Sequence, residues 1–515
     1  MKRPFLASAL CAAVLLPALA AASCAGHSPS PPPSPTPSPA SSSTPTFGAT
    51  LNVRSFGATG NGDTNDSVAV QNAVNQAAAA HGTVYLPAGT YLCSTPIELA
   101  DHVRVRGEGD ASWIKGQMVF ASDDRVERLK MGDAGRSAVT NSSDASGTTF
   151  TDCRFHGGGS REGVDSSVVY LGGSQGNVSD ILFARCQIER TSYVPPAGVD
   201  AFAKNVGNTI SIHEFCYLPH DGHVERITFR DCHLGAFNGV AKGALRMMME
   251  AFTWDNRTEL VYHGWKDLTF DGCTIEASDN GCLDFADRPL SSDSTRHSAS
   301  GVLITGCTFL GAASDATYGH GGLPITYECP TGIVIRNNTF YASPHEAIGG
   351  SWVGKGVTDA PALLIEGNTF DMTSSPVGLE HDRGEPCISL VGYGSRVLAN
   401  TFVYDSGLGV LIKGGSGHSY TTAGNLVEGN TFTDERTENG EPTIMFTDDA
   451  GRGCRDNHIT GNTIYNRSAD NAGVIAQTSG SGTNFAEDNL IYCGSAPPFL
   501  VISDHVVQSG NTVLQ

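Results

Sequence analysis

Short runs that alternate apolar and polar residues follow one another along most of the chain. Residues 180–183 (DILF) and 332–336 (GIVIR) are typical. Each run is too short for a helix and has the two-residue period of a β-strand. Helical periodicity does not separate these runs, which argues against leucine-rich and helical repeats. The pattern therefore predicts an all-β chain of short strands and turns.

The same short phrase follows each apolar run: a small or polar residue, then Cys or Asn, then any residue and an apolar one. The Cys or Asn recurs every 22 to 46 residues. Its copies are Cys153, Cys186, Cys232, Cys273, Cys307, Asn338, Asn368, Asn400, Asn430, Asn462, Asn489 and Asn511. Such a period is typical of a solenoid. We predict a right-handed parallel β-helix of about a dozen coils, each burying its apolar face against the next.

The repeated Cys and Asn predict a ladder of stacked turn residues. Equivalent residues of neighbouring coils lie one strand spacing apart, about 4.8 Å. Asn side chains can hydrogen-bond up such a stack, and Cys is a small, easily buried substitute. An exported protein could pair some cysteines as disulfides, but the ladder favours free thiols. Zinc is not expected, since no close Cys/His pair has finger-type spacing.

Residues 52–92 read NVRSFGATGNGDTNDSVAVQNAVNQAAAAHGTVYLPAGTYL. This stretch resembles the N-terminal segment of the pectate lyase superfamily, which many polysaccharide lyases, polygalacturonase-like hydrolases and phage tailspikes share. We expect Asp66 to cap a helix over residues 67–80. Its apolar stripe consists of Val70, Val74 and Ala77. Such a helix can close the open end of the solenoid.

The first residues of the chain predict export. Two basic residues precede an apolar run, residues 5–20, that is shorter than the ~20 residues needed to span a bilayer. Small residues then lead to Cys24 in a pattern that resembles a bacterial lipobox, where the cysteine is acylated. We predict a lipoprotein-type signal peptide over residues 1–23 and lipidation of Cys24. An ordinary signal peptidase site near residues 18–20 is the alternative.

Residues 24–46 are rich in Ser, Pro and Thr and favour extended conformations. We expect this segment to tether the β-helix, residues 47–515, to the outer face of the cell membrane. The membrane contact would be through the lipid anchor only, and a secreted form would be the alternative. The oligomeric state stays open.

The amino-acid composition excludes some classes of binding partner and favours others. The 515 residues include 53 Asp and Glu against 32 Lys and Arg, a net charge of −21. A nucleic-acid partner is not expected, since such binding depends on Lys and Arg. The 61 glycines fit a chain with many turns. The negative charge would repel a polyanion at a distance, which favours a neutral or weakly charged glycan.

The two longest spacings between ladder positions fall between Cys186 and Cys273 and indicate a face with loops. Three predicted strands near this face carry acidic residues after an apolar run. The candidates are Glu250, Asp284, Asp287 and Glu328. In register they would form one acidic row, with carboxylates about 5 or 9.5 Å apart. These distances bracket the spacings of glycoside hydrolysis. Solvated surface acids or calcium ligands are the alternatives.

Two further segments are similar to polygalacturonase motifs. Residues 278–282 (SDNGC) resemble that family's Asp-Asp-Cys segment, with Asn280 at the second Asp. Residues 319–321 (GHG) resemble its Gly-His-Gly, which implies a catalytic role for His320. An Arg-x-Lys substrate clamp does not follow, so galacturonan is not implied. As sugar contacts we expect Arg288, His345 and Trp352, through guanidinium forks and aromatic stacking.

A rival segment, residues 217–221 (YLPHD), resembles the Asp-Pro-His-Asp signature of β-helical mannuronan epimerases. It implies substrate contacts for His220 and Asp221, although Leu218 stands where the first Asp belongs. Epimerases and lyases both remove the proton next to a uronate carboxylate. They need a base and a positive group to stabilise the resulting charge.

We therefore expect a cell-surface, carbohydrate-active enzyme that hydrolyses a polysaccharide with paired carboxylates. One of Asp284, Asp287 and Glu328 would be the general acid. A lyase or C5-epimerase acting on a uronate polymer is the alternative, and a non-catalytic glycan-binding protein is the second alternative. A cofactor is not required for hydrolysis, and Ca²⁺ is the cation that such acids could bind.

Overall fold

The computed structural model divides the chain between Thr46 and Phe47 into two units. All described residues belong to the second unit. They are 47–133, 137–157, 167–172, 176–189, 208–213, 224–235, 246–252, 266–276, 283–288, 300–311, 323–328, 331–352, 363–382, 384–414, 421–436, 441–448, 453–467, 474–477, 482–493, 497–501 and 506–514.

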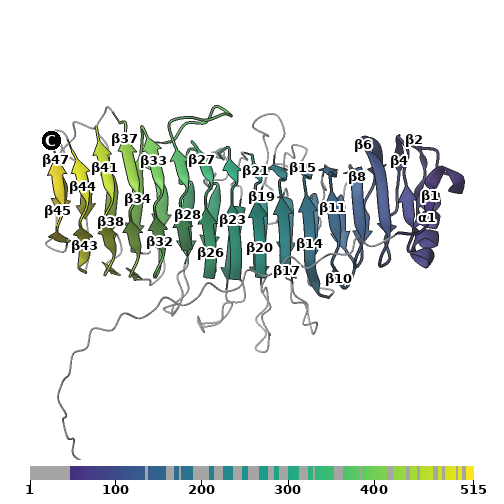
Figure 1. Ribbon diagram of the computed structural model, residues 1–515, viewed down its shortest axis with the longest axis horizontal. Coiled ribbons are helices and arrows are strands. Elements are labelled where there is room, and N and C mark those ends of the chain that lie inside the picture. The colour runs from purple at the N-terminus through teal and green to yellow at the C-terminus, as the bar shows by residue number, and fades with distance from the viewer. Residues whose placement is uncertain are drawn as a thin grey trace, which may run out of the picture. The chain divides into compact units, whose positions relative to one another are not determined.

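This unit is a parallel β-helix whose coils stack along one axis, from α1 (Ser67–Ala80) to β47 (Thr512–Leu514) (Figure 1). A typical coil contributes two strands, its first and second legs, to a 31-stranded sheet and a third leg to a 14-stranded sheet. The strands of the described residues pair in parallel with their equivalents in neighbouring coils. The all-β fold with an N-terminal capping helix is therefore confirmed.

The first legs lie before the ladder turn. They are β1 (Thr50–Asn52), β3 (Thr83–Tyr85), β10 (Ala145–Ser146), β11 (Thr149–Thr151), β14 (Val178–Ala184), β17 (Val224–Arg230), β20 (Lys266–Asp271), β23 (Ser300–Thr305), β26 (Thr331–Arg336), β29 (Leu363–Glu366), β32 (Arg396–Leu398), β36 (Leu426–Glu428), β40 (His458–Thr460), β43 (Asn484–Glu487) and β46 (Val506–Ser509). The strands β6 (Arg104–Lys115) and β8 (Arg125–Gly132) run through both legs.

The second legs follow the turn. They are β2 (Asn61–Asn65), β4 (Gly89–Leu92), β12 (Arg154–His156), β15 (Gln187–Glu189), β18 (His233–Gly235), β21 (Thr274–Ile275), β24 (Thr308–Phe309), β27 (Thr339–Tyr341), β30 (Thr369–Asp371), β33 (Thr401–Tyr404), β37 (Thr431–Asp434), β41 (Thr463–Asn466), β44 (Leu490–Tyr492) and β47.

The third legs form the 14-stranded sheet. They are β5 (Ile97–Glu98), β7 (Met118–Phe120), β9 (Val139–Asn141), β13 (Val169–Gly172), β16 (Asn208–His213), β19 (Arg246–Phe252), β22 (Leu283–Arg288), β25 (Ile325–Glu328), β28 (Ile348–Trp352), β31 (Pro386–Leu390), β34 (Leu408–Lys413), β38 (Ile444–Thr447), β42 (Ile475–Gln477) and β45 (Phe499–Val501). A separate pair joins β35 (Thr422–Ala423) to β39 (Cys454–Arg455).

The predicted ladder is present at the turn between the first and second legs. The side-chain oxygen of Asn400 accepts from the backbone N–H of Asn368 (2.8 Å) and from its amide (2.9 Å). The amide of Asn400 donates in turn to Asn430 (3.0 Å). The ladder cysteines are free and buried, and the thiol of Cys186 donates to the carbonyl of Phe150 in the preceding coil (3.4 Å). The expectation of free thiols on the ladder is confirmed.

A second ladder was missed by the sequence analysis. The backbone N–H of Ser395 donates to the side chain of Asn425 (2.8 Å), and the amide of Asn425 donates to Asn457 (2.8 Å). The amide of Asn457 donates to Asn484 (2.9 Å). Ser395, Asn425 and Asn457 directly precede the first legs of successive coils, and Asn484 begins the next one, so a second turn is stabilised in the same way.

Stacked aromatic rings form much of the core next to the first ladder. Phe340, Phe370, Phe402 and their neighbours lie parallel with ring centroids 4.5–4.8 Å apart. Each of these rings follows a ladder residue by two positions, so strand alternation directs it into the core. The repeated phrase thus specifies both the turn and the packing beneath it.

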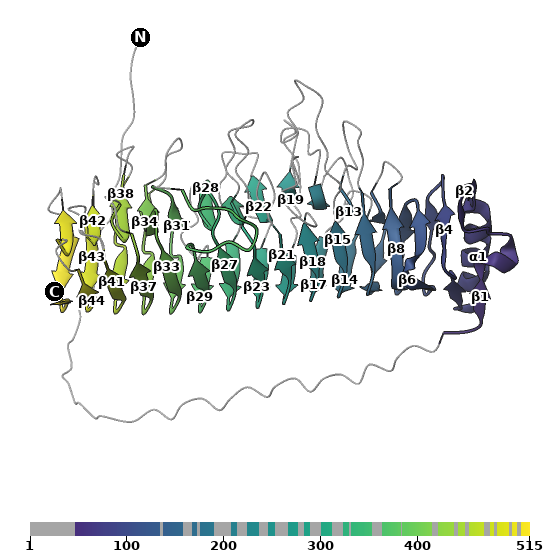
Figure 2. The same cartoon turned by 90° about the horizontal axis from the view of Figure 1, so that it is seen from above.

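The helix α1 closes the N-terminal end of the coil stack (Figure 2). Val70, Val74 and Ala77 are buried against the core, as predicted. The predicted cap is wrong, because the Asp66 side chain makes no capping hydrogen bond. Its carboxylate instead accepts from the backbone N–H groups of Thr59 (2.8 Å) and Gly60 (2.9 Å). This buried carboxylate therefore orders the turn before the helix.

Within the described part of the chain, none of the helices has the length and apolar character needed to cross a membrane. Residues 1–46, which carry the predicted signal peptide, Cys24 and tether, lie outside the described residues. Those assignments stay predictions.

Candidate functional site

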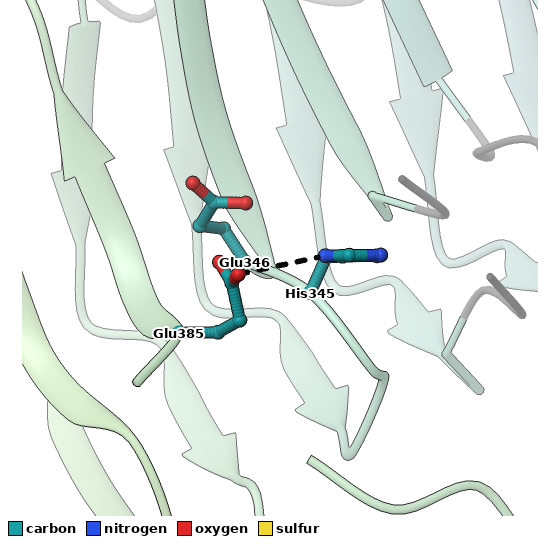
Figure 3. A group of neighbouring side chains, drawn as sticks. All are labelled: His345, Glu346 and Glu385. Atoms are coloured by element: carbon teal, nitrogen blue, oxygen red, sulfur yellow. Dashed lines mark ion pairs between the residues drawn. The ribbon is translucent and has the colours of Figure 1, made fainter. Parts of the chain in front are cut away.

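Three polar side chains meet where two neighbouring third legs begin (Figure 3). His345 and Glu346 lie in the turn that leads into β28, and Glu385 directly precedes β31. The strands β28 and β31 are paired neighbours, and the N–H of Ala347 donates to the carbonyl of Cys387 (3.0 Å). This register brings the residues before each strand side by side, although 40 positions separate His345 from Glu385.

The three groups are close enough to interact directly. One ligand atom from each lies within 4.8 Å of the others. Nδ1 of His345 lies 3.8 Å from Oε1 of Glu385. The His345 side chain is 27% exposed, and the Glu385 side chain is 34% exposed. Glu346 is also partly exposed. A ligand in solution can therefore reach the cluster.

The surroundings shift the pKa values of the two carboxyl groups in opposite directions. The imidazole of His345, 3.8 Å away, lowers the pKa of Glu385 against the opposing effect of burial. Burial raises the pKa of Glu346, and the charge of Glu385 raises it further. The neighbouring carboxylate of Glu385 raises the pKa of His345. Two carboxyls with pKa values shifted in opposite directions are the arrangement expected of an acid and a base.

The same three side chains offer one nitrogen and two carboxylate oxygens, a set that could hold a divalent cation. The side chain of Lys413 adds one positive charge nearby. Its positive charge is near enough to contribute, as a lesser cause, to lowering the pKa of both Glu346 and Glu385. The two carboxylates outnumber this one positive charge, so the cluster fits either a cation or an acid–base pair.

The predicted acidic row lies on β19, β22 and β25, where the backbone register is defined. Glu250 pairs with Ala286, and Ala286 pairs with Glu328. An alanine occupies the place between the two glutamates, so the expectation of one continuous acidic row is wrong. Asp284 lies two residues before Ala286, and Asp287 lies one residue after it.

Buried side chains of β22 fix the register of this strand. Leu283 and Phe285 are fully buried, and a slip of one residue would turn both out of the core. The side chains of the four predicted acids lie outside the described residues. Their catalytic roles therefore stay predictions. Glu250 and Glu328 stand in one row, two strand spacings or about 9.6 Å apart.

The remaining predicted site residues differ in how far the structure describes them. His345 belongs to the cluster described above. Arg288 ends β22 and Trp352 ends β28, but their side chains lie outside the described residues. His320, His220 and Asp221 lie wholly outside them.

Sequence reasoning missed Glu346 and Glu385. Both precede an apolar run, whereas the acids predicted from the sequence follow one. Residues 344–346 (PHE) and 385–386 (EP) share a feature that could have revealed them. In each, a proline lies within two residues of the acid, close to the start of a third leg, and restricts the backbone there.

Comparison with known proteins supports the predicted resemblance. Residues 50–145 match the family model "Rhamnogalacturonase A/epimerase, pectate lyase-like". Residues 260–433 match the model "Right handed beta helix region". The resemblance to the pectate lyase superfamily and the right-handed sense of the coils are thereby confirmed. The search of curated proteins finds no match.

Solved structures give a consistent fold. PfbA, a surface adhesin of Streptococcus pneumoniae, is 15% identical with a TM-score of 0.52, over 83% of this chain and 94% of its own. Tailspike protein 3 of bacteriophage CBA120 is 12% identical (TM-score 0.47; 90% of this chain, 61% of its own). The A-module of the Azotobacter vinelandii mannuronan C-5 epimerase AlgE4 is 15% identical (TM-score 0.31; 89% and 100%). The likeness to PfbA concerns the fold alone.

Proposed function

We propose that this protein is an exported, lipid-anchored enzyme that hydrolyses glycosidic bonds of a polysaccharide. Glu346 is the general acid, and Glu385 is the base or nucleophile. The observation that carries the proposal is the opposite shift of the two carboxyl pKa values at a partly exposed site. The family match of residues 50–145 supports a carbohydrate substrate.

The distances favour a particular stereochemistry. Carboxyls about 5–5.5 Å apart act as acid and nucleophile in retaining enzymes, and a wider gap leaves room for water in inverting ones. Oxygen atoms of Glu346 and Glu385 lie within 4.8 Å. The cluster therefore favours retention, with Glu385 as the nucleophile. His345 keeps this carboxylate ionised and orients it.

The predicted residues on neighbouring third legs extend the site. We propose that Glu250, Asp284, Asp287, Glu328, Arg288 and Trp352 line the substrate path beside β28. In the linear stack of coils, an extended glycan lying across successive third legs would contact them in turn. His320, His220 and Asp221 are proposed as contacts from the adjoining segments.

The test uses the full chain and a panel of neutral and uronate polysaccharides. Hydrolysis predicts new reducing ends without the ultraviolet absorbance of unsaturated uronates. Glu346→Gln and Glu385→Gln should each lower kcat by about 10²–10⁴-fold, and Glu428→Gln, an exposed glutamate on β36, should not. Unsaturated products would instead support a lyase, and binding without turnover would support an adhesin. Full activity of both site variants would remove the assignment.

Export is proposed from residues 1–24 alone. A Cys24→Ala variant should lose its membrane association and appear in the soluble fraction. Retention of Cys24→Ala in the membrane fraction would contradict the lipid anchor.

A further inference from the structure

A buried histidine lies directly behind the proposed acid and base. His381 belongs to the segment between β30 and β31 and retains 6% of its exposure. It has no access to a substrate in solution. Its ring nevertheless contacts both chain segments that carry the two glutamates.

Both ring nitrogens of His381 face backbone oxygens. Nδ1 lies 2.9 Å from the carbonyl of Ser343, and Nε2 lies 3.0 Å from the carbonyl of Glu385. Ser343 is three residues before Glu346, and its hydroxyl donates to the carbonyl of His345 (3.0 Å). Burial lowers the pKa of His381, and the neutral ring donates to one of these carbonyls while it packs against the other. One ring therefore lies between the turn that holds the acid and the residue that serves as the base.

Neighbouring bonds hold His381 itself in place. The hydroxyl of Ser406, in the next coil, donates to the carbonyl of His381 (2.6 Å). The N–H of Asp382 donates to the carbonyl of Pro344 (3.3 Å). Gly407 packs so closely that a Cβ there would lie 2.8 Å from Nε2 of His381. Turns from three successive coils thus converge on this side chain.

We infer that His381 is a positioning residue, which sets the separation between the carboxyls of Glu346 and Glu385. The inference rests on the proposed function. The stacking of the coils fixes the positions of the strands. His345 and Glu346, however, lie in a turn outside the paired strands. The imidazole fills the space between that turn and Glu385 and donates to one of the two carbonyls, which restrains their separation. A misplacement of about 1 Å at reacting groups can reduce the rate about 10²-fold.

The inference predicts a separable kinetic effect. His381→Ala should lower kcat about 10-fold or more while KM changes little, because the ring does not touch substrate. His381→Gln, which can still donate to one carbonyl, should recover part of kcat. His458→Gln is a control away from the site, since the partly exposed His458 lies on β40 and neighbours Glu487 (3.3 Å).

A measurement independent of turnover separates this inference from the proposed function. The titration of His345 is followed by NMR in the full chain, with the resonance assigned from His345→Gln. In His381→Ala or His381→Gln, the His345 pKa should fall toward its ordinary value, because Glu385 moves away from it. An unchanged His345 titration in either folded variant would overturn the positioning role, whether or not a glycan is turned over. If His381→Ala does not fold, His381→Gln carries the test.

Discussion

The residue before each ladder position has the most restricted backbone of the repeat. At all twelve positions it adopts a left-handed conformation with φ between 50° and 65°. Gly, Asn and Asp tolerate this region best, and they fill ten of the twelve positions. Arg185 (φ 50°) and Ala399 (φ 51°) are the exceptions. The small or polar residue of the repeated phrase is therefore a backbone requirement.

Ala399 offers a direct test of this requirement. Ala399→Gly should stabilise the protein by about 0.5–1 kcal/mol. Relief of ~1–2 kcal/mol of left-handed strain exceeds the ~0.5–1 kcal/mol entropic cost of glycine. Gly429→Ala, at the equivalent turn with φ 63° and open space around its Cβ, should destabilise by a similar amount. Urea unfolding of both variants checks the pair, and equal stabilities would contradict the backbone account.

Among the elements, α1 protects the end of the core. Replacing Val74 with Lys should cost at least about 2 kcal/mol, because apolar contact is lost and a charge must be buried. Val74 is 2% exposed, whereas Val68 on the same helix is 69% exposed. Val68→Lys is therefore the matched control and should leave the thermal midpoint unchanged. Similar losses in both variants would show that α1 does not act as a cap.

At the same scale, the strands were far more predictable than the site. The sequence phrase at the ladder repeats because each copy has the same local structure. One residue adopts a left-handed conformation, and the next places its side chain in the stack. The pairing of Glu385 with His345 depends instead on the register between two third legs, which the turns around residues 344 and 385 determine. The carboxylate of Asp66 shows the same limit. Its position suggested a helix cap, but the fold supplies Thr59 and Gly60 as partners.

At the scale of the whole molecule, the described part of the chain is held together without disulfides. All nine described cysteines are free and buried. Burial raises the pKa of Cys93 and of Cys454 to about 12, so these thiols are neutral and unreactive at neutral pH. Stability of an exported protein would then rest on coil stacking.

Alkylation of the native protein followed by peptide mapping tests this arrangement. The nine cysteines should stay unmodified until the chain is unfolded, and reductant should not change the thermal midpoint. They are Cys93, Cys153, Cys186, Cys232, Cys273, Cys307, Cys387, Cys454 and Cys493. A disulfide-linked peptide between ladder neighbours, or rapid labelling of Cys232, would contradict the account.

The central claim is that the stacked coils place Glu346 and Glu385 together. Their surroundings then shift the pKa values of the two carboxyl groups in opposite directions. In the proposed mechanism, activity requires an ionised Glu385 and a protonated Glu346. The pKa of Glu385 is lowered and that of Glu346 is raised, on either side of the ordinary value of about 4.3. The profile of kcat/KM against pH should therefore be bell-shaped.

The most direct test is this pH profile, measured for the natural protein and for Glu346→Gln on a polysaccharide that the natural protein is found to cleave. The natural protein should lose activity below the lowered pKa of Glu385 and above the raised pKa of Glu346. Glu346→Gln should retain the acid limb and lose the alkaline limb, at a much lower rate. An alkaline limb that survives in Glu346→Gln would show that another group is the acid.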